Sequence, residues 1–305
     1  MYKRQGVADR SGQGVVVALQ ANYLEVELDP PHQAIRLLCT RRTRLSHRGS
    51  AVHVGDRVRV EAIDLDQGRA VVAAVERRHS WLSRPPVANV SAVVVALAVE
   101  EPAFDPDQAS RFLLTAEQTG LQVKVLLTKC DLISAQQRQA LSDRLKGWGY
   151  DPFLMSASTG EGLVGLREWL VSQPLSVLCG PSGVGKSSLL NGLLPQLRLR
   201  VGAVSGRLRR GRHTTRHVEL HPIGPGARVA DTPGFNRPDL PKDLRNLEVL
   251  FPELRSQLDP HPCRFRDCLH RGEPGCGVSR EWERYGIYRR AVDELLELNR
   301  PTRGG

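Results

Sequence analysis

The chain has 305 residues, of which 40% are hydrophobic and 25% are charged, and its formal net charge is +10. This composition is that of an ordinary globular protein, its length suffices for about two or three domains, and no apolar run is long enough to span a membrane. The basic balance favours a polyanionic partner, either nucleic acid or a membrane surface.

Residues 1–78 consist of short β-type runs separated by turns that contain glycine. The run GVVVALQANYLEVEL contains two strands with a turn at QAN, and the runs AIRLLCT, DRVRVEAI and GRAVVAAVE follow it. The stretch DRVRV alternates polar and apolar residues, as a half-buried strand does. About five short strands without a convincing helix predict a small barrel of the OB type, and a fragment of a β-sandwich is the alternative.

Residues 79–242 alternate between strand and helix patterns. Strands are expected in VSAVVVALAVE, QVKVLLTKCD, DPFLMSAS, LSVLC and ARVADTPG, of which the first is a continuous apolar run typical of a strand buried on both faces. Helices are expected in PDQASRFLLTAEQTG, in SAQQRQALSDRLKGWG with Ser134 as its N-cap, and in EGLVGLREWLVSQ. The alternation predicts a parallel sheet with helices on both faces.

A phosphate-binding motif stands between one of these strands and a helix. The stretch GPSGVGKS fits the pattern G-x-x-x-x-G-K-[ST], in which glycines let backbone N–H groups turn toward phosphate oxygens. Lys186 is expected to reach the β- and γ-phosphates, Ser187 to coordinate Mg²⁺, and the helix to offer its positive N-terminal end. The predicted loop comprises Gly180, Pro181, Ser182, Gly183, Val184, Gly185, Lys186, Ser187 and Ser188.

Three further loops follow predicted strands, where parallel sheets bind ligands. In DTPG, Asp231 is expected to hold the Mg²⁺ shell and the N–H of Gly234 to meet the γ-phosphate. In TKCD the carboxylate of Asp131 could accept hydrogen bonds from guanine N1 and N2, a donor pair that adenine lacks. The predicted base site comprises Thr128, Lys129, Cys130 and Asp131, with backbone support for guanine O6 from Ser156 and Ala157 in the stretch SAS.

The order of these loops differs from that of an ordinary GTPase, in which the phosphate loop comes before the base-reading loop. Here the base-reading loop comes first and the phosphate loop follows it. A circular permutation explains this order, because joining the old ends through LVSQPL and opening a new pair leaves the strand ends in place. We therefore interpret all of these loops as parts of one permuted nucleotide site.

A Cys/His cluster near the C-terminus predicts a metal site. The stretch CRFRDCLHRGEPGC has the spacing C-x4-C-x-H-x5-C, and three thiolates with one imidazole form a closed tetrahedral Zn²⁺ set of Cys263, Cys268, His270 and Cys276. A closed set leaves no position for substrate, so the zinc would be structural, and free buried cysteines are the alternative. Residues 243–305 are thus expected to form a small, mostly helical zinc-binding domain that ends in a helix within SREWERYGIYRRAVDELLELNR. The scattered Cys39, Cys130 and Cys179 are expected to be inert hydrophobic residues.

The barrel, the permuted loop order and the Cys/His cluster together resemble the ribosome small subunit-dependent GTPase A family (RsgA, YjeQ or EngC) over nearly the whole chain. The resemblance implies a GTPase that binds the small ribosomal subunit and its rRNA and assists late maturation. It also implies that the subunit stimulates hydrolysis, which is linked to release. One departure is Thr128, where many GTPases have Asn; Thr keeps a hydroxyl but lacks the amide, which predicts a modest affinity for guanine.

The residues that promote hydrolysis are less evident from the sequence. The stretch GRHTTRH at 211–217 is the candidate switch I, in which either Thr214 or Thr215 closes on Mg²⁺ and the γ-phosphate. Phe235 stands where many GTPases have a Gln that orients the attacking water, so another group or a partner must do this. The resemblance implies His213, and a merely solvated histidine is the alternative. Basic clusters expected to contact rRNA comprise Arg41, Arg42, Arg44 and Arg48, and then Arg207, Arg209, Arg210, Arg212 and Arg216.

We therefore expect a monomeric GTP hydrolase that exchanges GTP and GDP and has no membrane partner. The start of the chain, MYKRQGVADRSGQGVVV, has no apolar stretch before a cleavage site, which predicts a cytoplasmic protein without a signal peptide. Two other classes remain open: an ATP-using P-loop enzyme, and an RNA-binding scaffold with a weak nucleotide site. The carboxylate of Asp131 argues against the first, and the intact Lys186, Ser187 and Asp231 argue against the second.

Overall fold

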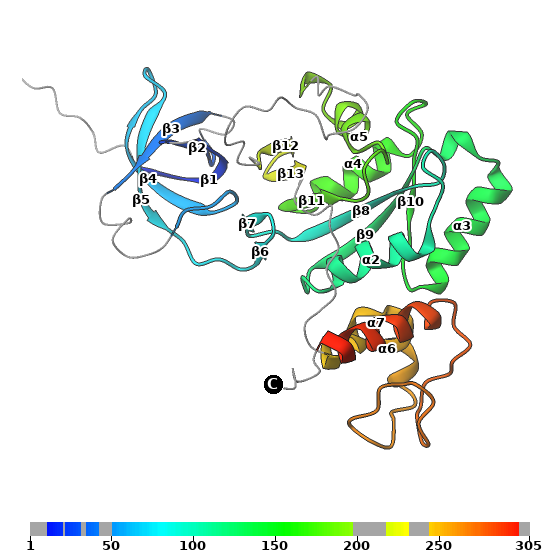
Figure 1. Ribbon diagram of the computed structural model, residues 1–305. Helices are drawn as coiled ribbons and strands as arrows, with labels where there is room; N and C mark the ends of the chain where they lie inside the picture. The colour runs from blue at the N-terminus through cyan, green and yellow to red at the C-terminus, as the bar shows by residue number, and fades with distance from the viewer. Residues whose placement is uncertain are drawn as a thin grey trace, which may run out of the picture. The chain divides into compact units, whose positions relative to one another are not determined.

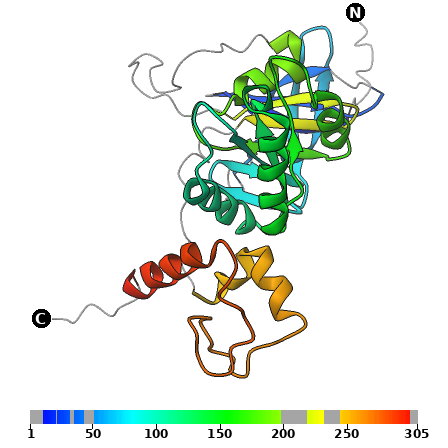
Figure 2. The same cartoon turned by 90° about the vertical axis from the view of Figure 1, so that its right-hand side faces the viewer.

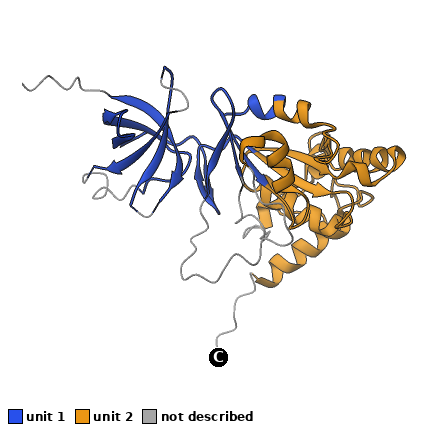
Figure 3. Cartoon of the chain, turned by 90° about the horizontal axis from the view of Figure 1, so that it is seen from above, with its two compact units in different colours: residues 1–92, 168–178, 207–235 blue, residues 93–167, 179–206, 236–305 orange. Residues whose placement is uncertain are grey.

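The computed structural model describes residues 11–20, 22–31, 35–42, 51–197, 218–231 and 244–298, with the backbone alone for Asp231. The chain divides into two compact units, which Figure 3 distinguishes by colour. The first contains residues 1–92, 168–178 and 207–235, and the second contains residues 93–167, 179–206 and 236–305. The finer division into three domains, with boundaries after residues 78 and 242, stays a prediction. No helix of the described ranges is long and apolar enough to cross a membrane.

The N-terminal strands close into a barrel with the order β1-β2-β3-β5-β4 (Figure 1). Its neighbours are antiparallel except for β3 and β5, which run parallel. Strand alternation sends one face of each strand inward, where buried residues such as Val26, Leu37 and Val60 form one apolar core. This confirms the predicted OB-type barrel. Its strands are β1 (Gly12–Leu19), β2 (Leu24–Leu28), β3 (Arg36–Arg41), β4 (Arg57–Asp64) and β5 (Arg69–Val75).

A short hairpin that the strand patterns do not predict follows the barrel. Its strands β6 (Trp81–Ser83) and β7 (Pro86–Ala88) pair antiparallel. The hairpin is attached to the barrel segment before β4, because Val54 and Val87 form a bridge and the N–H of Ala88 donates to the carbonyl of Val54 at 2.9 Å. Strands of three residues are too short to show a period, which explains why the sequence does not reveal them.

The central sheet has six strands in the order β10-β9-β8-β11-β13-β12. Pairs β9 with β10 and β11 with β13 are parallel, as predicted, but the edge strand β12 is antiparallel to β13. A tight turn joins these two strands directly, and such a hairpin requires antiparallel pairing, which corrects the all-parallel expectation. The strands are β8 (Ala92–Ala98), β9 (Gln122–Thr128), β10 (Phe153–Leu154), β11 (Leu175–Cys179), β12 (Leu220–Gly224) and β13 (Ala227–Asp231).

The helices between the strands begin at capping residues that the sequence contains. The carboxylate of Asp105 accepts hydrogen bonds from the backbone N–H groups of the first turn of α2, and Ser134 forms a reciprocal capping box with Gln137 at the start of α3. The prediction for Ser134 is thus confirmed. The helices are α2 (Pro106–Glu117), α3 (Ala135–Gly147), α4 (Leu163–Val171) and α5 (Lys186–Leu193), with 3₁₀ turns η1 (Cys130–Leu132) and η2 (Pro195–Leu197).

The C-terminal region is helical and packs within the second unit. Figures 1 and 2 show α6 and α7 side by side next to α2. Buried aromatic and aliphatic residues, among them Phe251, Leu254 and Tyr288, form its core together with Leu114 of α2. The last helix begins at Tyr285, later than the sequence pattern predicts, because Glu283 and Arg284 are held by other parts of the unit. The elements are η4 (Leu244–Asn246), η5 (Glu248–Leu250), α6 (Pro252–Leu258) and α7 (Tyr285–Leu298).

Within the first unit, the barrel is bonded to the strands that lead to Asp231. The guanidinium of Arg228 on β13 donates to the carboxylate of Glu27 on β2 at 2.8 Å, and both residues are buried. A bridge between Ala18 and Glu219 adds a second connection. Because removal of one partner of a buried pair leaves an unpaired charge, this contact strongly favours the observed attachment.

Candidate functional site

The predicted phosphate loop connects β11 with α5, and two of its glycines are required by the backbone. Gly180 has φ of +139°, and a Cβ there would lie 2.1 Å from the carbonyl oxygen of Ala96 on β8. Gly185, directly before α5, has the left-handed φ of +91°, which other residues rarely adopt. The ammonium of Lys186 donates to the carbonyls of Gly180 and Pro181, each at 2.8 Å, so that this cation is held at the loop.

The predicted base-reading loop is attached to the phosphate loop through Thr128. This residue ends β9 and is only 3% exposed. Its hydroxyl lies 2.6 Å from the carbonyl oxygen of Val184 in the phosphate loop and 3.3 Å from that of Leu97 on β8. Since one hydroxyl donates one proton, the shorter contact is the hydrogen bond. Thr128 therefore braces the two loops against each other without the amide that Asn would supply.

Asp131 follows Thr128 on the 3₁₀ turn η1, and its carboxylate is oriented by serine hydroxyls. The hydroxyl of Ser158 donates to Asp131 Oδ2 at 2.8 Å, and the hydroxyls of Ser156 and Ser158 are themselves 2.8 Å apart. Hydrogen bonds from Ser156 and Ser158 favour the charged form and lower the pKa of Asp131 below its ordinary value. A carboxylate that stays ionised at neutral pH is the acceptor that guanine N1 and N2 require.

The base-reading loop and the phosphate loop line one cavity of about 260 Å³. Its wall combines the carboxylate side of η1, the stretch after β10 and the loop before α5. The cavity therefore joins the carboxylate expected to read guanine with the loop expected to hold phosphates. The lining residues are Glu101, Thr128, Lys129, Asp131, Leu132, Met155, Ala157, Ser158, Val184, Gly185 and Ser188.

Some predicted site residues line this cavity and others support it from behind. Cys130 is buried, its N–H donates to the carbonyl of Met155 at 3.1 Å, and burial raises the pKa of its thiol. Ser156 is also fully buried and acts on Asp131 through Ser158. Sequence reasoning did not identify Glu101, whose carbonyl accepts a hydrogen bond from the ammonium of Lys129. It also did not assign a side-chain role to Ser158, although a hydroxyl directly after the predicted O6 support was a usable signal.

Several predicted residues lie outside the described side chains. The candidate switch I, with His213, Thr214 and Thr215, and the switch II residues Gly234 and Phe235 belong to this group. The backbone of Asp231 ends β13 and pairs with Leu178 of β11, two residues before the phosphate loop begins. The same holds for Arg44, Arg48, Arg207, Arg209, Arg210, Arg212 and Arg216.

The predicted metal ligands converge in the C-terminal region. One ligand atom from each of Cys263, Cys268, His270 and Cys276 lies within 4.8 Å of the others. The Nδ1 of His270 is 3.4, 3.7 and 3.6 Å from the sulfurs of Cys263, Cys268 and Cys276, and the sulfurs of Cys263 and Cys276 are 3.9 Å apart. A tetrahedral ion with Zn–S of about 2.3 Å and Zn–N of about 2.05 Å requires roughly 3.6 Å and 3.8 Å for these separations. The cluster can therefore bind a metal ion of tetrahedral preference.

Groups around the cluster hold its ligands in place. The backbone N–H groups of Gly277 and Val278 donate to the sulfurs of Cys263 and Cys276, at 3.2 and 3.4 Å. The other ring nitrogen of His270 lies 3.0 Å from the carboxylate of Glu248 on η5. A carboxylate behind a histidine ligand fixes the ring orientation and the tautomer. Sequence reasoning missed Glu248, which is distant in the chain from the cysteines.

Comparison with known proteins identifies the family. An RsgA GTPase family model matches residues 75–241. The chain belongs to the RsgA GTPase family. The small ribosomal subunit biogenesis GTPases RsgA of Synechococcus sp. strains CC9605 and CC9311 are 72% and 71% identical to it. The first alignment covers 96% of this chain and 97% of the relative, and the second covers 98% and 99%.

Two solved structures of RsgA-like proteins share the fold of this chain. The crystal structure of YjeQ from Thermotoga maritima has a TM-score of 0.77 and 29% identity, covering 94% of this chain and 99% of that one. YloQ, described as a circularly permuted GTPase, has a TM-score of 0.79 and 27% identity, covering 98% and 99%. The chain is therefore a GTPase, and its loop order is that of a permuted one.

In this RsgA GTPase the metal cluster and the nucleotide loops belong to one compact unit, and a buried arginine attaches the C-terminal region to α3. Arg284 is fully buried and forms a two-pronged ion pair with Glu253 of α6. Its guanidinium lies between the rings of Trp148 and Phe251, 4.8 and 4.9 Å from their centroids. The indole N–H of Trp148 donates to Glu283 at 2.8 Å. This contact was not predictable from local patterns.

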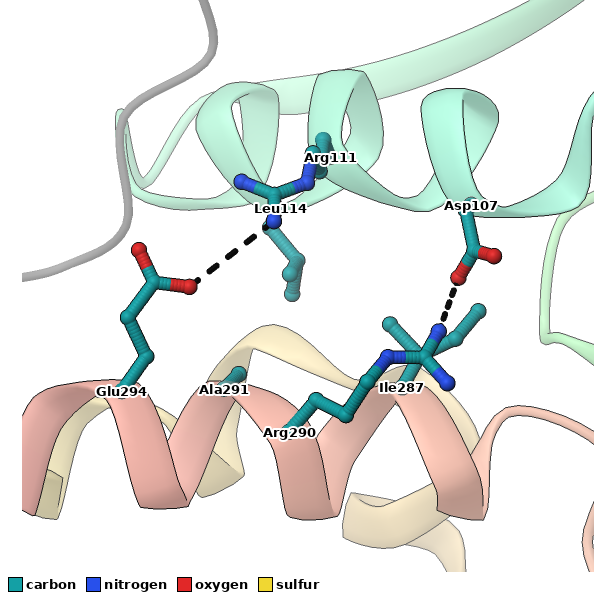
Figure 4. Close-up of a pocket in the computed structure, with 7 residues that line it drawn as sticks. All are labelled: Asp107, Arg111, Leu114, Ile287, Arg290, Ala291 and Glu294. Atoms are coloured by element: carbon teal, nitrogen blue, oxygen red, sulfur yellow. Dashed lines mark hydrogen bonds and ion pairs between the residues drawn. The ribbon is translucent and has the colours of Figure 1, made fainter.

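A second contact between α2 and α7 is open to solvent. Figure 4 shows a cavity of about 290 Å³ that is flanked by two ion pairs of opposite direction. Arg111 of α2 lies 3.7 Å from Glu294, and Arg290 of α7 pairs with Asp107. These side chains are about half exposed or more, so each pair contributes only about 0–1 kcal/mol. The attachment therefore depends on the buried Arg284 contact and the apolar core.

Proposed function

We propose that this GTPase binds GTP in the cavity between the base-reading and phosphate loops and acts on the small ribosomal subunit late in its maturation. Hydrolysis to GDP and phosphate is stimulated by the subunit and coupled to release. The observation that carries the nucleotide assignment is the single cavity lined by Asp131, Lys129 and the phosphate-loop residues Val184, Gly185 and Ser188. The printed name of the close relatives, small ribosomal subunit biogenesis GTPase, supports the partner.

The nucleotide is held by groups with separate tasks. Asp131 accepts hydrogen bonds from guanine, the stem of Lys129 lies along the ring, and the backbone of Ala157 meets O6. The loop from Gly180 to Ser188 surrounds the phosphates, with Lys186 on the β- and γ-phosphates. Adenine offers no N1–H and N2–H pair to the carboxylate, so this arrangement selects GTP.

Hydrolysis uses residues of the switches. His213 orients the attacking water, because Phe235 occupies the position at which many GTPases have Gln and cannot do so. A chain of this kind turns over slowly until docking on the subunit orders switch I. The arginines beside His213 contact rRNA.

Two metal ions complete the proposal. Ser187, Asp231 and either Thr214 or Thr215 would hold Mg²⁺, which neutralises charge that develops on the phosphates. Zn²⁺ is the ion assigned to the Cys263, Cys268, His270 and Cys276 cluster, because three thiolates and one imidazole with tetrahedral spacing suit it best. With four protein ligands this ion has a structural role.

The division of labour follows the three predicted domains. Residues 1–78 form an OB-type barrel, a fold that binds oligonucleotides, and the net charge of +10 suits an RNA partner. Residues 79–242 bind and hydrolyse GTP, and residues 243–305 carry the zinc. A monomeric state and a cytoplasmic location complete the proposal.

The decisive experiment measures GTP hydrolysis by the purified protein alone and with small subunits, large subunits or free rRNA. Selective stimulation by small subunits is the expected result, and Lys186→Ala is the matched inactive control. Equal stimulation by large subunits would overturn the proposed partner.

Two competing functions give different results in the same assays. An ATP-using enzyme would show ATP competing with GTP at similar concentrations. A passive RNA-binding scaffold would show the same turnover in the wild type and in Lys186→Ala, with and without subunits.

A further inference from the structure

Trp81 of the β6–β7 hairpin is an exposed aromatic side chain with an ordered environment. It is 43% exposed, and it is the only exposed large apolar residue within the described range 51–91. The guanidinium of Arg78 lies 4.7 Å from the centroid of its ring, and the ring of His53 lies 4.7 Å away in an edge-on arrangement. Both contacts belong to the first compact unit.

One buried carboxylate fixes both neighbours of this indole. Asp56 is fully buried and accepts hydrogen bonds from Arg78 Nε at 2.7 Å, from Arg78 Nη2 at 2.9 Å and from the backbone N–H of His53 at 2.8 Å. Arg78 Nη2 also donates to the carbonyl of Ala51 at 2.8 Å. The guanidinium is therefore fully engaged and cannot leave the indole ring without breaking this buried ion pair.

The hairpin itself is anchored, so the indole is presented on a rigid support. The hydroxyl of Ser80 donates to the carbonyl of Val90 at 2.6 Å, and the backbone N–H of His79 donates to the side chain of Asn89 at 2.8 Å. Asn89 in turn donates to the carbonyl of Gly55 at 3.0 Å. A pre-organised aromatic face loses little conformational entropy when a flat ligand stacks on it.

The charges around Trp81 favour an anionic ligand. Arg77 and His79 are exposed beside it, and Arg78 adds a fixed positive charge. Burial and the charge of Arg78 lower the pKa of His53, so its imidazole is an uncharged aromatic neighbour at neutral pH. A membrane or an apolar protein surface would need further exposed apolar residues next to the indole, and the described range 51–91 has none.

We propose that Trp81 is a stacking platform for one unpaired base of an RNA strand, with Arg77 placed to contact an adjacent phosphate. This inference rests on the proposed function, in which RNA of the small subunit is the partner. Stacking of a base on an aromatic ring tolerates any sequence, because every base has a π-face. The platform therefore recognises a single-stranded segment rather than a sequence.

The test compares Trp81→Leu, which keeps an apolar side chain but removes the ring, with Trp81→Phe, which keeps a ring. Binding is measured to a short oligouridylate and to purified small subunits. Loss of one base stack weakens binding by about 5- to 100-fold in Trp81→Leu, and Trp81→Phe retains most of the affinity. The dependence of affinity on salt keeps its slope in both variants, whereas Arg77→Gln lowers the slope by about one.

Two measurements separate stacking from a role in folding. Thermal unfolding and GTP affinity of Trp81→Leu should match the wild type. Oligouridylate should quench a component of the wild-type tryptophan fluorescence that Trp81→Phe lacks, and this comparison does not depend on Trp81→Leu being folded. Equal quenching in wild type and Trp81→Phe, or equal affinity in wild type and Trp81→Leu, would overturn the platform. Wild-type protein that fails to bind small subunits at all would instead overturn the proposed function.

Discussion

Replacement of Thr128 by Val tests how the base-reading loop is held against the phosphate loop. The two side chains have nearly the same shape, so the change removes the hydroxyl and little else. The hydrogen bond to the carbonyl of Val184, at 2.6 Å, is lost in a site that is 3% exposed. Depriving a buried carbonyl of its donor costs about 1–3 kcal/mol.

Part of this cost should appear as a loss of nucleotide affinity, because the two loops that form the cavity are no longer fixed to each other. If about 1–2 kcal/mol appears in binding, the Kd for GDP rises by roughly 5- to 30-fold. The preference for GDP over ADP should not change, because Asp131 and its serine partners are intact. Titration calorimetry or a fluorescent guanine nucleotide measures both quantities.

The control is Thr128→Ser, which keeps the hydroxyl and should bind GDP within a few-fold of the wild type. Unchanged GDP affinity in Thr128→Val, with a folded protein, would refute the bracing role. Loss of guanine preference in Thr128→Val would show that Thr128 acts on the base itself, which also contradicts the reasoning.

Other predictions concern single contacts in the same compact unit. Ser158→Ala removes a donor to the carboxylate of Asp131 and raises its pKa toward the ordinary value, so guanine affinity should begin to fall at a higher pH on acidification. Identical acid limbs in the two proteins would contradict this. Glu248→Gln should weaken zinc binding by about 10- to 100-fold in chelator competition, with GTP affinity unchanged, and equal zinc retention would exclude its supporting role. Arg284→Met strands a buried carboxylate and should cost about 3–5 kcal/mol in urea unfolding, whereas Arg290→Ala should cost about 0–1 kcal/mol; similar losses would show that burial does not decide their contribution.

The residues that perform local tasks could be recognised in the sequence. The glycines at positions 180 and 185 are required by the backbone of the phosphate loop, and Ser134 by the first turn of its helix. The five barrel strands follow from their alternation, and the cysteine spacing predicts the metal cluster. The side chains of His213, Thr214 and Thr215 remain predictions because they lie outside the described residues.

The sequence alone thus determined the residue types of the site, the strands that carry them and their permuted order, because each depends on the backbone within a few residues. Only the tertiary structure decided which partners these residues meet: Thr128 with Val184, Asp131 with Ser158, and His270 with Glu248. It also decided that β12 is antiparallel and that the last helix begins at Tyr285. The physical reason is that hydrogen bonds and packing between distant segments depend on how the elements come together in space, which no local period or spacing records.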